Sequence, residues 1–395
     1  MREAGWNTER EKLHRYGDRV RVLALNAGSR SVKAQLLEVT ADSRPEASRE
    51  ALWSGERTHR DGEADTSDAV RGLLADLGDA AFDVAAHRIV QTASIPRATA
   101  EPFDAALVAD VEAAIPLAPL HARAVLAAKA AFEAERPGTP QFGVFDSAFH
   151  RTLPRRAALF SGPYAWYEAG LRKIGFHGLS YTYCTARTRA DLGDARSARI
   201  VCAHLGGGCS LAAIADGASI DTTMGYTPVD GVTMVSRSGA VDPGLILHLL
   251  RSGRYSLDEL DRVLNEDSGV RGIAGDDGDL RDVRAASERG DARATLALEV
   301  FCYRVRCAIG ALSAALGGLD VLVFTGGIGR HDVKTRAEIC AGLAHLGIVL
   351  DQERNTAAGD GARIEASRAA TAVLVLETHE EWIMALAVRD AAKLR

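Results

Sequence analysis

Two apolar segments of the chain each lead into a turn rich in glycine and serine, and a second apolar segment follows each turn. The first pair reads VLALNAGSRSVKAQLLEV over residues 22–39, and the second reads IVCAHLGGGCSLAAI over residues 200–214. Apolar runs on both sides of such a turn predict paired strands. Because glycine has no Cβ, the turn also lets backbone N–H groups approach an anion closely. The repeated plan indicates two related lobes that hold one phosphate-bearing ligand.

Either turn alone is explained equally well as an ordinary β-hairpin, since Asn and Gly are favoured there for conformational reasons. A third glycine loop changes this balance. The apolar run 321–325 leads into Gly326, Gly327 and Gly329, and a segment of helical pattern follows. Three such loops in one chain favour phosphate binding over three unrelated turns.

The remaining pattern alternates between strands and helices. Apolar residues at helical spacing predict helices over about 67–77 and over 293–316, and glycines follow both segments. Continuous apolar runs predict strands at 84–90, 142–145 and 373–376. A final helix follows the last of these strands. This alternation predicts an α/β fold.

Composition narrows the classes of function. The 395 residues suggest two to three domains, on a prior of ~150 residues per domain. A formal charge of −6 and the lack of a basic run argue against a nucleic-acid partner. The sequence has no apolar membrane span, and residues 1–18 form a charged extension without the apolar core of a signal peptide. Six cysteines without a CxxC pair indicate thiols in a reducing compartment, so we expect a cytoplasmic protein.

Familiar motifs exclude several mechanisms. The sequence contains no GxxxxGK[ST], which excludes a P-loop. The run TGGIGRH at 325–331 is similar to a dinucleotide fingerprint, but it comes late in its lobe, so dinucleotide binding is a minor alternative. The run HEE at 379–381 is not the HExxH of a zinc protease.

Six polar residues follow or interrupt apolar or glycine-rich runs: Arg88, His121, Asp146, His177, Arg237 and Glu380. Each one alone is explained as well by a salt bridge or a helix cap as by catalysis. Two arginines, two histidines and two carboxylates beside three phosphate loops fit phosphoryl transfer as a set. That reaction requires positive charge at the phosphoryl oxygens and a divalent metal held by carboxylates.

Ten ordered motifs resemble the acetate kinase family, in the superfamily of actin, heat-shock ATPases and sugar kinases. The resemblance extends along nearly the whole chain from residue 22. The motifs are LNAGSRSVK at 25–33, HRIV at 87–90, APLH at 118–121, FDSAFH at 145–150, GFHGLS at 175–180, HLGGGCS at 204–210, DTTMGYTPVDGVTMVSRSGAVDPG at 221–244, DGDLRD at 277–282, FTGGIG at 324–329 and THEE at 378–381.

The resemblance implies a fold of two actin-like (ribonuclease H-like) lobes, each a mixed sheet flanked by helices, with the active site in the cleft between them. We expect the lobes to span 19–151 and 152–380, with the terminal helix 381–395 packed near the first lobe. The implied reaction is reversible phosphorylation of a short carboxylic acid, acetate or propionate, by ATP with Mg²⁺ or Mn²⁺. The implied assembly is a homodimer.

The resemblance also implies roles for individual residues. Arg88 and Arg237 would grip the carboxylate and the transferring phosphoryl group, and His177 and His121 would donate to its oxygens. Metal ligands would be Asn26, Asp146 and Glu380. The alkyl pocket would be formed by Val90, Leu120, Phe176 and Pro228. Nucleotide contacts would come from Asn26, Ser29, Ser31, Lys33, His204, Gly206, Gly208, Asp279, Leu280, Arg281, Gly327, Ile328 and His331.

The sequence departs from the family pattern at four places. Gln91-Thr92-Ala93 replaces the usual His-Gly-Gly, and Ala122-Arg123 replaces Asn-Pro. Gly207 replaces a usual Asn, and Arg330-His331 replaces Glu-Asn. These changes leave the acid, the phosphoryl donor and the direction of the reaction open. They also leave open a catalytically weakened or regulatory paralogue. A nucleotide-driven conformational switch is a separate alternative, because such proteins of the same superfamily share the core.

Overall fold

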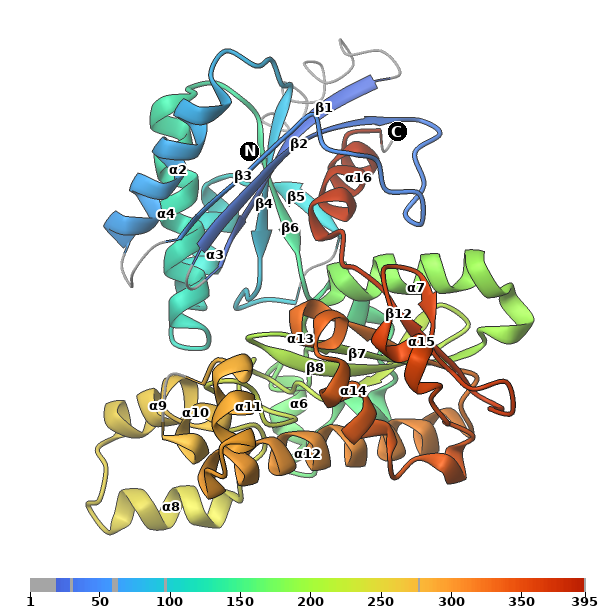
Figure 1. Cartoon of the computed structure of the whole chain (residues 1–395). Coiled ribbons are helices and arrows are strands. Elements are labelled where there is room, and N and C mark those ends of the chain that lie inside the picture. The colour runs from blue at the N-terminus through green and yellow to red at the C-terminus, as the bar shows by residue number, and fades with distance from the viewer. Residues whose placement is uncertain (1–18, 29–30, 59–62, 96–97, 276–277, 394–395) are drawn as a thin grey trace. The chain divides into compact units, whose positions relative to one another are not determined.

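In the computed structural model, residues 19–28, 31–58, 63–95, 98–275 and 278–393 are described, and they divide into two compact units (Figure 1). Unit 1 holds the chain up to Phe149 together with the C-terminal segment from His379. Unit 2 spans His150–Thr378. The expected N-terminal extension 1–18 and the expected nucleotide contact Ser29 lie outside the described residues.

Six strands make up one mixed sheet in the described part of unit 1, in the order β3-β2-β1-β4-β6-β5. The central strands β1, β4 and β6 pair in parallel, whereas β2, β3 and β5 join them antiparallel. The strands are β1 (Arg19–Ala27), β2 (Ser31–Thr40), β3 (Trp53–Thr58), β4 (Val84–Ile89), β5 (Ala100–Pro102) and β6 (Gln141–Phe145).

Helices cover both faces of this sheet (Figure 1). On one face, α2 (Glu63–Leu77) and α4 (Pro119–Glu135) build an apolar core in which Leu73 and Phe132 are fully buried, and α3 (Ala105–Ala113) extends it. On the other face lies α16 (Glu380–Lys393), where the indole of Trp382 donates to the carbonyl of Arg44 at 3.0 Å. The helix α2 begins at Glu63, before the predicted residue 67.

In unit 2, six strands within the described residues also form one mixed sheet, in the order β11-β12-β10-β7-β8-β9. They are β7 (Arg199–Leu205), β8 (Cys209–Ala215), β9 (Ala218–Thr222), β10 (Val321–Thr325), β11 (Ala362–Arg363) and β12 (Ala372–Val375). The α-helices are α5 (Arg155–Ala158), α6 (Tyr164–Glu168), α7 (Gly178–Leu192), α8 (Pro243–Arg251), α9 (Leu257–Glu266), α10 (Gly269–Ala274), α11 (Leu280–Glu288), α12 (Ala292–Leu316), α13 (Gly326–His331), α14 (Val333–Cys340) and α15 (Gln352–Thr356).

The helix α12 contains 25 residues and supplies much of the core of unit 2, through Phe301, Val305 and Ile309 among others. Its apolar positions are interrupted by arginines and a glutamate. Over the described residues, no helix combines the length and the apolar character that a membrane span requires.

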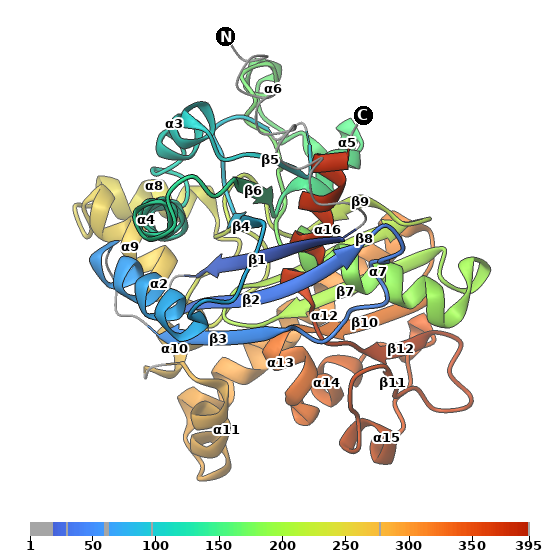
Figure 2. The ribbon, with the colours of Figure 1, turned by 90° about the horizontal axis from the view of Figure 1, so that it is seen from above.

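The two described sheets share one topology. When the sheet of unit 2 is listed as β9-β8-β7-β10-β12-β11, each strand corresponds in order and direction to one of β3-β2-β1-β4-β6-β5. Figure 2 shows the strands β1, β2 and β3 side by side in the first of these sheets. The prediction of two related lobes, each with a mixed sheet flanked by helices, is therefore confirmed. Both glycine turns join the corresponding antiparallel pairs, β1–β2 and β7–β8.

The third glycine loop packs closely on the end of β7. Gly326 has a φ of +76°, and a Cβ there would lie 2.5 Å from the carbonyl oxygen of Leu205. Gly317, which ends α12 with a φ of +68°, has no other described atom within 4 Å of its Cβ position.

We expect Gly317→Ala to lower the free energy of unfolding by about 1–2 kcal/mol, the cost of left-handed backbone. Gly326→Ala should cost a further ~1–3 kcal/mol from the clash.

Urea denaturation of both variants measures this difference. Gly317→Ala is the matched control, because it carries the same backbone strain without the clash. Equal losses in the two variants would contradict the close packing of the third loop on β7.

Candidate functional site

Polar side chains of unit 1 gather at one edge of its sheet. Asn26 lies near the end of β1, Arg88 near the end of β4, and Asp146 directly after β6. Because these three strands are parallel, their carboxyl ends share one edge. The start of α16 adds Glu380 and Glu381. We call these five residues the carboxylate cluster.

Direct hydrogen bonds hold the carboxylate cluster together. The Arg88 guanidinium donates from Nη2 to Asp146 Oδ2 at 2.8 Å and from Nη1 to Asn26 Oδ1 at 3.2 Å, and its Nη1 lies 3.4 Å from Glu380 Oε2. The Asn26 amide donates to Glu380 Oε2 at 3.2 Å and to Glu381 Oε1 at 3.0 Å. All five side chains are buried or nearly so. The cluster is therefore ordered by its own contacts.

The charges of the carboxylate cluster do not balance, since three carboxylates face one guanidinium. Burial works against the charge of Arg88, yet Asp146 and Glu380 together raise its pKa above the ordinary arginine value. Burial and the adjacent charge of Glu380 raise the pKa of Glu381, although Lys33 and the Asn26 hydrogen bond oppose this rise. A bound cation would relieve the repulsion between the carboxylates.

The donor set of the cluster suits Mg²⁺, which prefers oxygen ligands and usually keeps several waters. Within the described residues, no group of three or more His, Cys, Asp or Glu side chains is preassembled as a metal site. A Mg²⁺ ion usually binds through one or two carboxylates together with phosphate oxygens and water. The expected ligands Asn26, Asp146 and Glu380 all belong to the cluster. Glu381 was not predicted, although the second Glu of THEE was the available signal.

In unit 2, the second and third glycine loops lie side by side. The position of a Cβ on Gly206 would be 3.9 Å from the backbone nitrogen of Gly327 and 3.7 Å from Nε2 of His204. The thiol of Cys209 donates to the carbonyl of Gly206 at 3.2 Å. Burial raises the pKa of Cys209 to about 12, so it stays a neutral thiol that braces the turn.

The His177 side chain projects from strained backbone. Within the described residues, His177 and Asp216 are the non-glycine residues with positive φ, and φ of His177 is +58°. Such a conformation costs free energy and is concentrated at functional sites. The ring stacks on that of His204, with centroids 4.1 Å apart. Each ring is also anchored through Nδ1, to Ser210 Oγ at 2.8 Å for His177 and to Ser180 Oγ at 2.9 Å for His204.

Two polar groups converge at Gly208. A Cβ at this glycine would lie 3.3 Å from Nη1 of Arg237 and 3.4 Å from Nε2 of His177. A side chain at position 208 would therefore crowd both groups. With glycine there, a guanidinium and an imidazole border the same point beside the glycine turn, an arrangement that can bind an anion.

The expected adenosine contacts lie in two places on unit 2. Asp279 caps α11 by accepting from the backbone N–H of Arg281 at 2.9 Å, and the Arg281 guanidinium lowers the pKa of Asp279 to about 2. The side chain of Arg281 is 90% exposed, whereas Leu280 is buried. Ile328 and His331 lie on α13.

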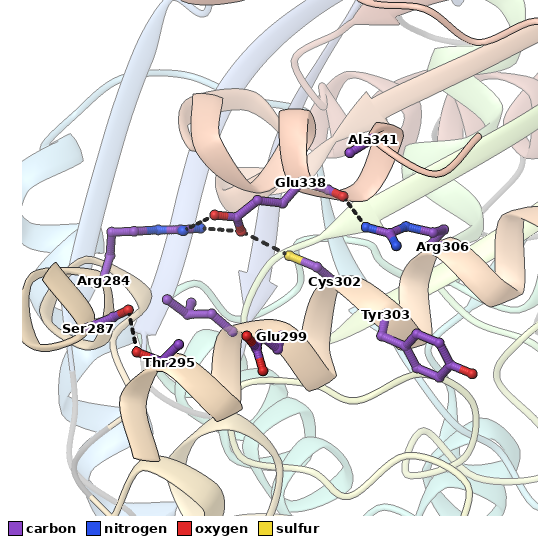
Figure 3. Close-up of a pocket in the computed structure, with 10 residues that line it drawn as sticks. Arg284, Ser287, Thr295, Glu299, Cys302, Tyr303, Arg306, Glu338 and Ala341 are labelled. Atoms are coloured by element: carbon purple, nitrogen blue, oxygen red, sulfur yellow. Dashed lines mark hydrogen bonds and ion pairs between the residues drawn. The ribbon is translucent and has the colours of Figure 1, made fainter. Parts of the chain in front are cut away.

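A pocket of about 500 Å³ lies between α11, α12 and α14 (Figure 3). Arg284 joins two of these helices, because it pairs with Glu338 and donates to Thr335 Oγ1 at 2.9 Å. Cys302 on α12 donates to Glu338 Oε2 at 3.3 Å. The lining residues include none of the expected site residues. The pocket thus lies outside the predicted residues, although α11 also carries the expected adenosine contacts Leu280 and Arg281, and α14 follows Ile328 and His331 along the chain.

The expected alkyl-pocket residues divide between the units. Val90 follows β4 and Leu120 lies in the first turn of α4, as does His121, all in unit 1. Phe176 and Pro228 belong to unit 2, where the Pro228 carbonyl accepts from Arg237 Nη1 at 3.4 Å. All four are apolar and at least partly buried.

Other predicted residues are neighbours of Asn26 and Val90, either along the chain or across paired strands. Lys33 of β2 is opposite Asn26 in register, and Ser31 closes the first turn by accepting from the Gly28 N–H at 2.8 Å. Gln91 and Thr92, where the sequence departs from the family, are buried; the Thr92 hydroxyl donates to the carbonyl of Ser94 at 2.6 Å. This bond gives the Thr92 side chain a partner within the altered segment after β4.

Similar sequences and solved structures show the family to which the chain belongs. The sequence profile of the Acetokinase family matches residues 21–386. The acetate kinase of Gloeobacter violaceus is 39% identical over 93% of this chain and 98% of that kinase. The crystal structure of Porphyromonas gingivalis acetate kinase is similar with a TM-score of 0.80 and 34% identity, covering 95% of this chain and 100% of that chain. A propionate kinase from Francisella tularensis gives a TM-score of 0.81 and 31% identity, covering 93% and 98%.

The charge imbalance of the carboxylate cluster predicts a dependence of stability on pH. Since the folded-state pKa of Glu381 is raised, its ionised form destabilises the fold at pH values above that pKa, and the loss disappears as pH falls below the unfolded value of 4.5. We expect Glu381→Gln to raise the melting temperature at pH 8. The gain should shrink toward pH 4.5.

Calorimetry across this pH range, without added metal, measures the effect. The exposed Glu112→Gln on α3 is the control and should show no such trend. A lower melting temperature for Glu381→Gln at pH 8 would contradict the repulsion described above.

Proposed function

Because the chain belongs to the Acetokinase family, we propose that it transfers the terminal phosphoryl group of ATP to acetate, reversibly, and forms acetyl phosphate and ADP. The convergence of His177 Nε2 and Arg237 Nη1 at Gly208, beside two glycine loops, is the observation that carries this proposal. It supplies hydrogen-bond donors and positive charge where a phosphoryl group needs them.

The acid itself is the nucleophile. A carboxylic acid with a pKa near ~4 is ionised at neutral pH, so no general base is required. One carboxylate oxygen attacks the terminal phosphorus while the bond from that phosphorus to the bridging oxygen breaks, and the electron pair leaves with ADP. The main obstacle is the repulsion between a carboxylate and a triphosphate. Arg88, Arg237, His177 and His121 would reduce this repulsion.

The two arginines would have distinct tasks. A guanidinium offers two parallel N–H donors that match a carboxylate or a phosphoryl group, which an ammonium does not. Arg237 lies next to the glycine turn, and we assign it to the transferring phosphoryl group. Arg88 belongs to the carboxylate cluster and is held there by Asp146 and Asn26. We assign it to the carboxylate of the acid. The unmet negative charge of that cluster supports a metal-binding role as well.

Mg²⁺ would be held by Asp146, Glu380 and Asn26, with Glu381 close by; Mn²⁺ has the same preference for oxygen. When bound, the metal would neutralise charge on the nucleotide phosphates. Asn26, Ser31, Lys33, His204, Gly206 and Gly208 would meet the phosphates. Asp279 to Arg281 and Gly327, Ile328 and His331 would line the adenosine.

We further propose a homodimer formed through unit 2. The helix α8 has no buried residue, although Leu245 and Leu247 are apolar and about half exposed. Leu296 and Tyr303 of α12 are exposed as well. Such apolar surface favours contact with a second copy.

A cytoplasmic location is supported by the six cysteines, all of which are within the described residues and are free thiols.

Replacement of Arg237 tests the assignment of the phosphoryl-binding group. We expect Arg237→Ala to lower kcat by about 100- to 1,000-fold, the usual cost of removing one preorganised donor. Arg237→Lys should recover little of this loss, because an ammonium lacks the forked geometry. The exposed Arg196→Ala in the same unit is the control. Near-normal turnover of Arg237→Ala in a coupled ATP assay would rule out this role.

The size of the acid tests the alkyl pocket and the reaction together. With Val90, Leu120, Phe176 and Pro228 around the alkyl group, acetate and propionate should be used well and butyrate poorly. One methylene is worth only ~1–3 kcal/mol in such a pocket, so acetate and propionate should differ modestly. Val90→Ala should shift preference toward the longer acids, chiefly through KM.

The measurement is kcat/KM for the three acids with ATP. Val84→Ala is the matched control, because Val84 is buried at the opposite end of β4. It should leave the ranking of acids unchanged. A parent enzyme that prefers butyrate, or an unchanged ranking in Val90→Ala, would remove Val90 from the acid site.

A further inference from the structure

We propose that Tyr181 and Ser210 form a buried hydroxyl relay that positions His177 and fixes its neutral ring in the tautomer with the proton on Nε2. The purpose of this proton, donation to the transferring phosphoryl group, rests on the proposed function. The tautomer itself is a property of the protein alone.

The three groups form a continuous chain. The Tyr181 hydroxyl lies 2.5 Å from Ser210 Oγ, which in turn lies 2.8 Å from Nδ1 of His177. Tyr181 and Ser210 are completely buried, and His177 is 9% exposed. His177 is the N-cap of α7, Tyr181 lies in the first turn of this helix, and Ser210 lies on β8. A relay built from two elements of the fold fixes the ring more firmly than a local contact would.

The acidity of the two hydroxyls sets the direction of the relay. A phenol, with a pKa near ~10, is a much stronger hydrogen-bond donor than an aliphatic alcohol. Tyr181 therefore donates to Ser210 Oγ, and the Ser210 hydroxyl then donates to Nδ1 of His177. An imidazole that accepts at Nδ1 carries its proton on Nε2 when it is neutral.

The proton on Nε2 is the one that the candidate site needs. Nε2 faces the point at Gly208 that Arg237 Nη1 also borders. With the proton on Nε2, both groups are donors toward an anion. The other tautomer would direct a lone pair at the same point and would repel a phosphoryl oxygen.

Neighbouring residues contact both the ring of His177 and the backbone that carries it. His150 accepts from or donates to Ser219 through Nδ1 at 2.8 Å, and its Nε2 donates to the carbonyl of Phe176 at 3.0 Å. Its ring also packs on Gly175, where a Cβ would lie 2.6 Å away. The stacked ring of His204 covers His177 from a further side. These contacts hold the strained backbone of residues 175–177.

Nitrogen NMR on enzyme with ¹⁵N-labelled histidine reads the tautomer directly, without substrate. The signals of His177 are assigned by their loss in His177→Gln. In the parent enzyme we expect a proton on Nε2 of His177. Ser210→Ala should shift His177 toward the other tautomer, and Tyr181→Phe should shift it partially.

Ser180→Ala is the matched control, because Ser180 makes the equivalent bond to Nδ1 of the neighbouring His204. It should change the signals of His204 and leave the tautomer of His177 unchanged. A parent His177 protonated on Nδ1 would overturn the proposal. An unchanged tautomer in Ser210→Ala, or in Tyr181→Phe should Ser210→Ala fail to fold, would overturn it too.

Steady-state kinetics distinguish a positioning role of Ser210 from a contribution to the stability of the fold alone. Ser210→Ala should lower kcat about 10-fold or more, as expected when a group that orients another residue is removed. In a His177→Ala background the same substitution should cause no further loss, because Ser210 acts through His177. Additive losses would contradict the relay. A parent with the Nε2 tautomer but no activity on short acids would refute the proposed function and leave the tautomer assignment standing.

Discussion

The parallel pairing of three central strands in each unit is the constraint on which the positions of the candidate site residues depend. Parallel strands all end at the same edge of a sheet, so residues distant in sequence are brought together without a dedicated scaffold. In unit 1 this edge receives Asn26, Arg88 and Asp146 from β1, β4 and β6. In unit 2 the corresponding edge receives the glycine turns that follow β7 and β10. One topology thus serves two different kinds of chemistry.

The two edges differ in charge. The carboxylate cluster of unit 1 carries more negative than positive groups, and burial together with Glu380 raises the pKa of Glu381. The corresponding edge of unit 2 presents glycine backbone, two histidines and Arg237, all suited to an anion. An acidic cluster of this kind suits a metal, and a glycine-lined edge suits phosphate.

The sequence predicted the elements that depend on local pattern and missed those that depend on contacts between elements. Glycine loops and long apolar helices have strong local signals, and the repeated strand-turn-strand plan correctly indicated two related lobes. Three short edge strands, β5, β9 and β11, have no such signal and were not predicted. Tyr181 and Ser210 are ordinary core residues by pattern, and only the distances from Ser210 Oγ to Tyr181 and to His177 link them to the histidine ring. The positive φ of His177 was equally hidden, because histidine does not signal left-handed backbone as glycine does.

The assignment of α16 to unit 1 has a consequence for the order in which the protein is made. The ribosome completes β1 to β6 long before it reaches Glu380 and Glu381, and all of unit 2 is synthesised in between. Until the last residues emerge, the face of the sheet that α16 covers stays open, and Asn26 lacks both of its carboxylate partners. Unit 2 is contiguous and can fold as the chain emerges. The carboxylate cluster accordingly cannot be complete before Glu380 and Glu381 are synthesised, and a chain truncated before α16 cannot form it.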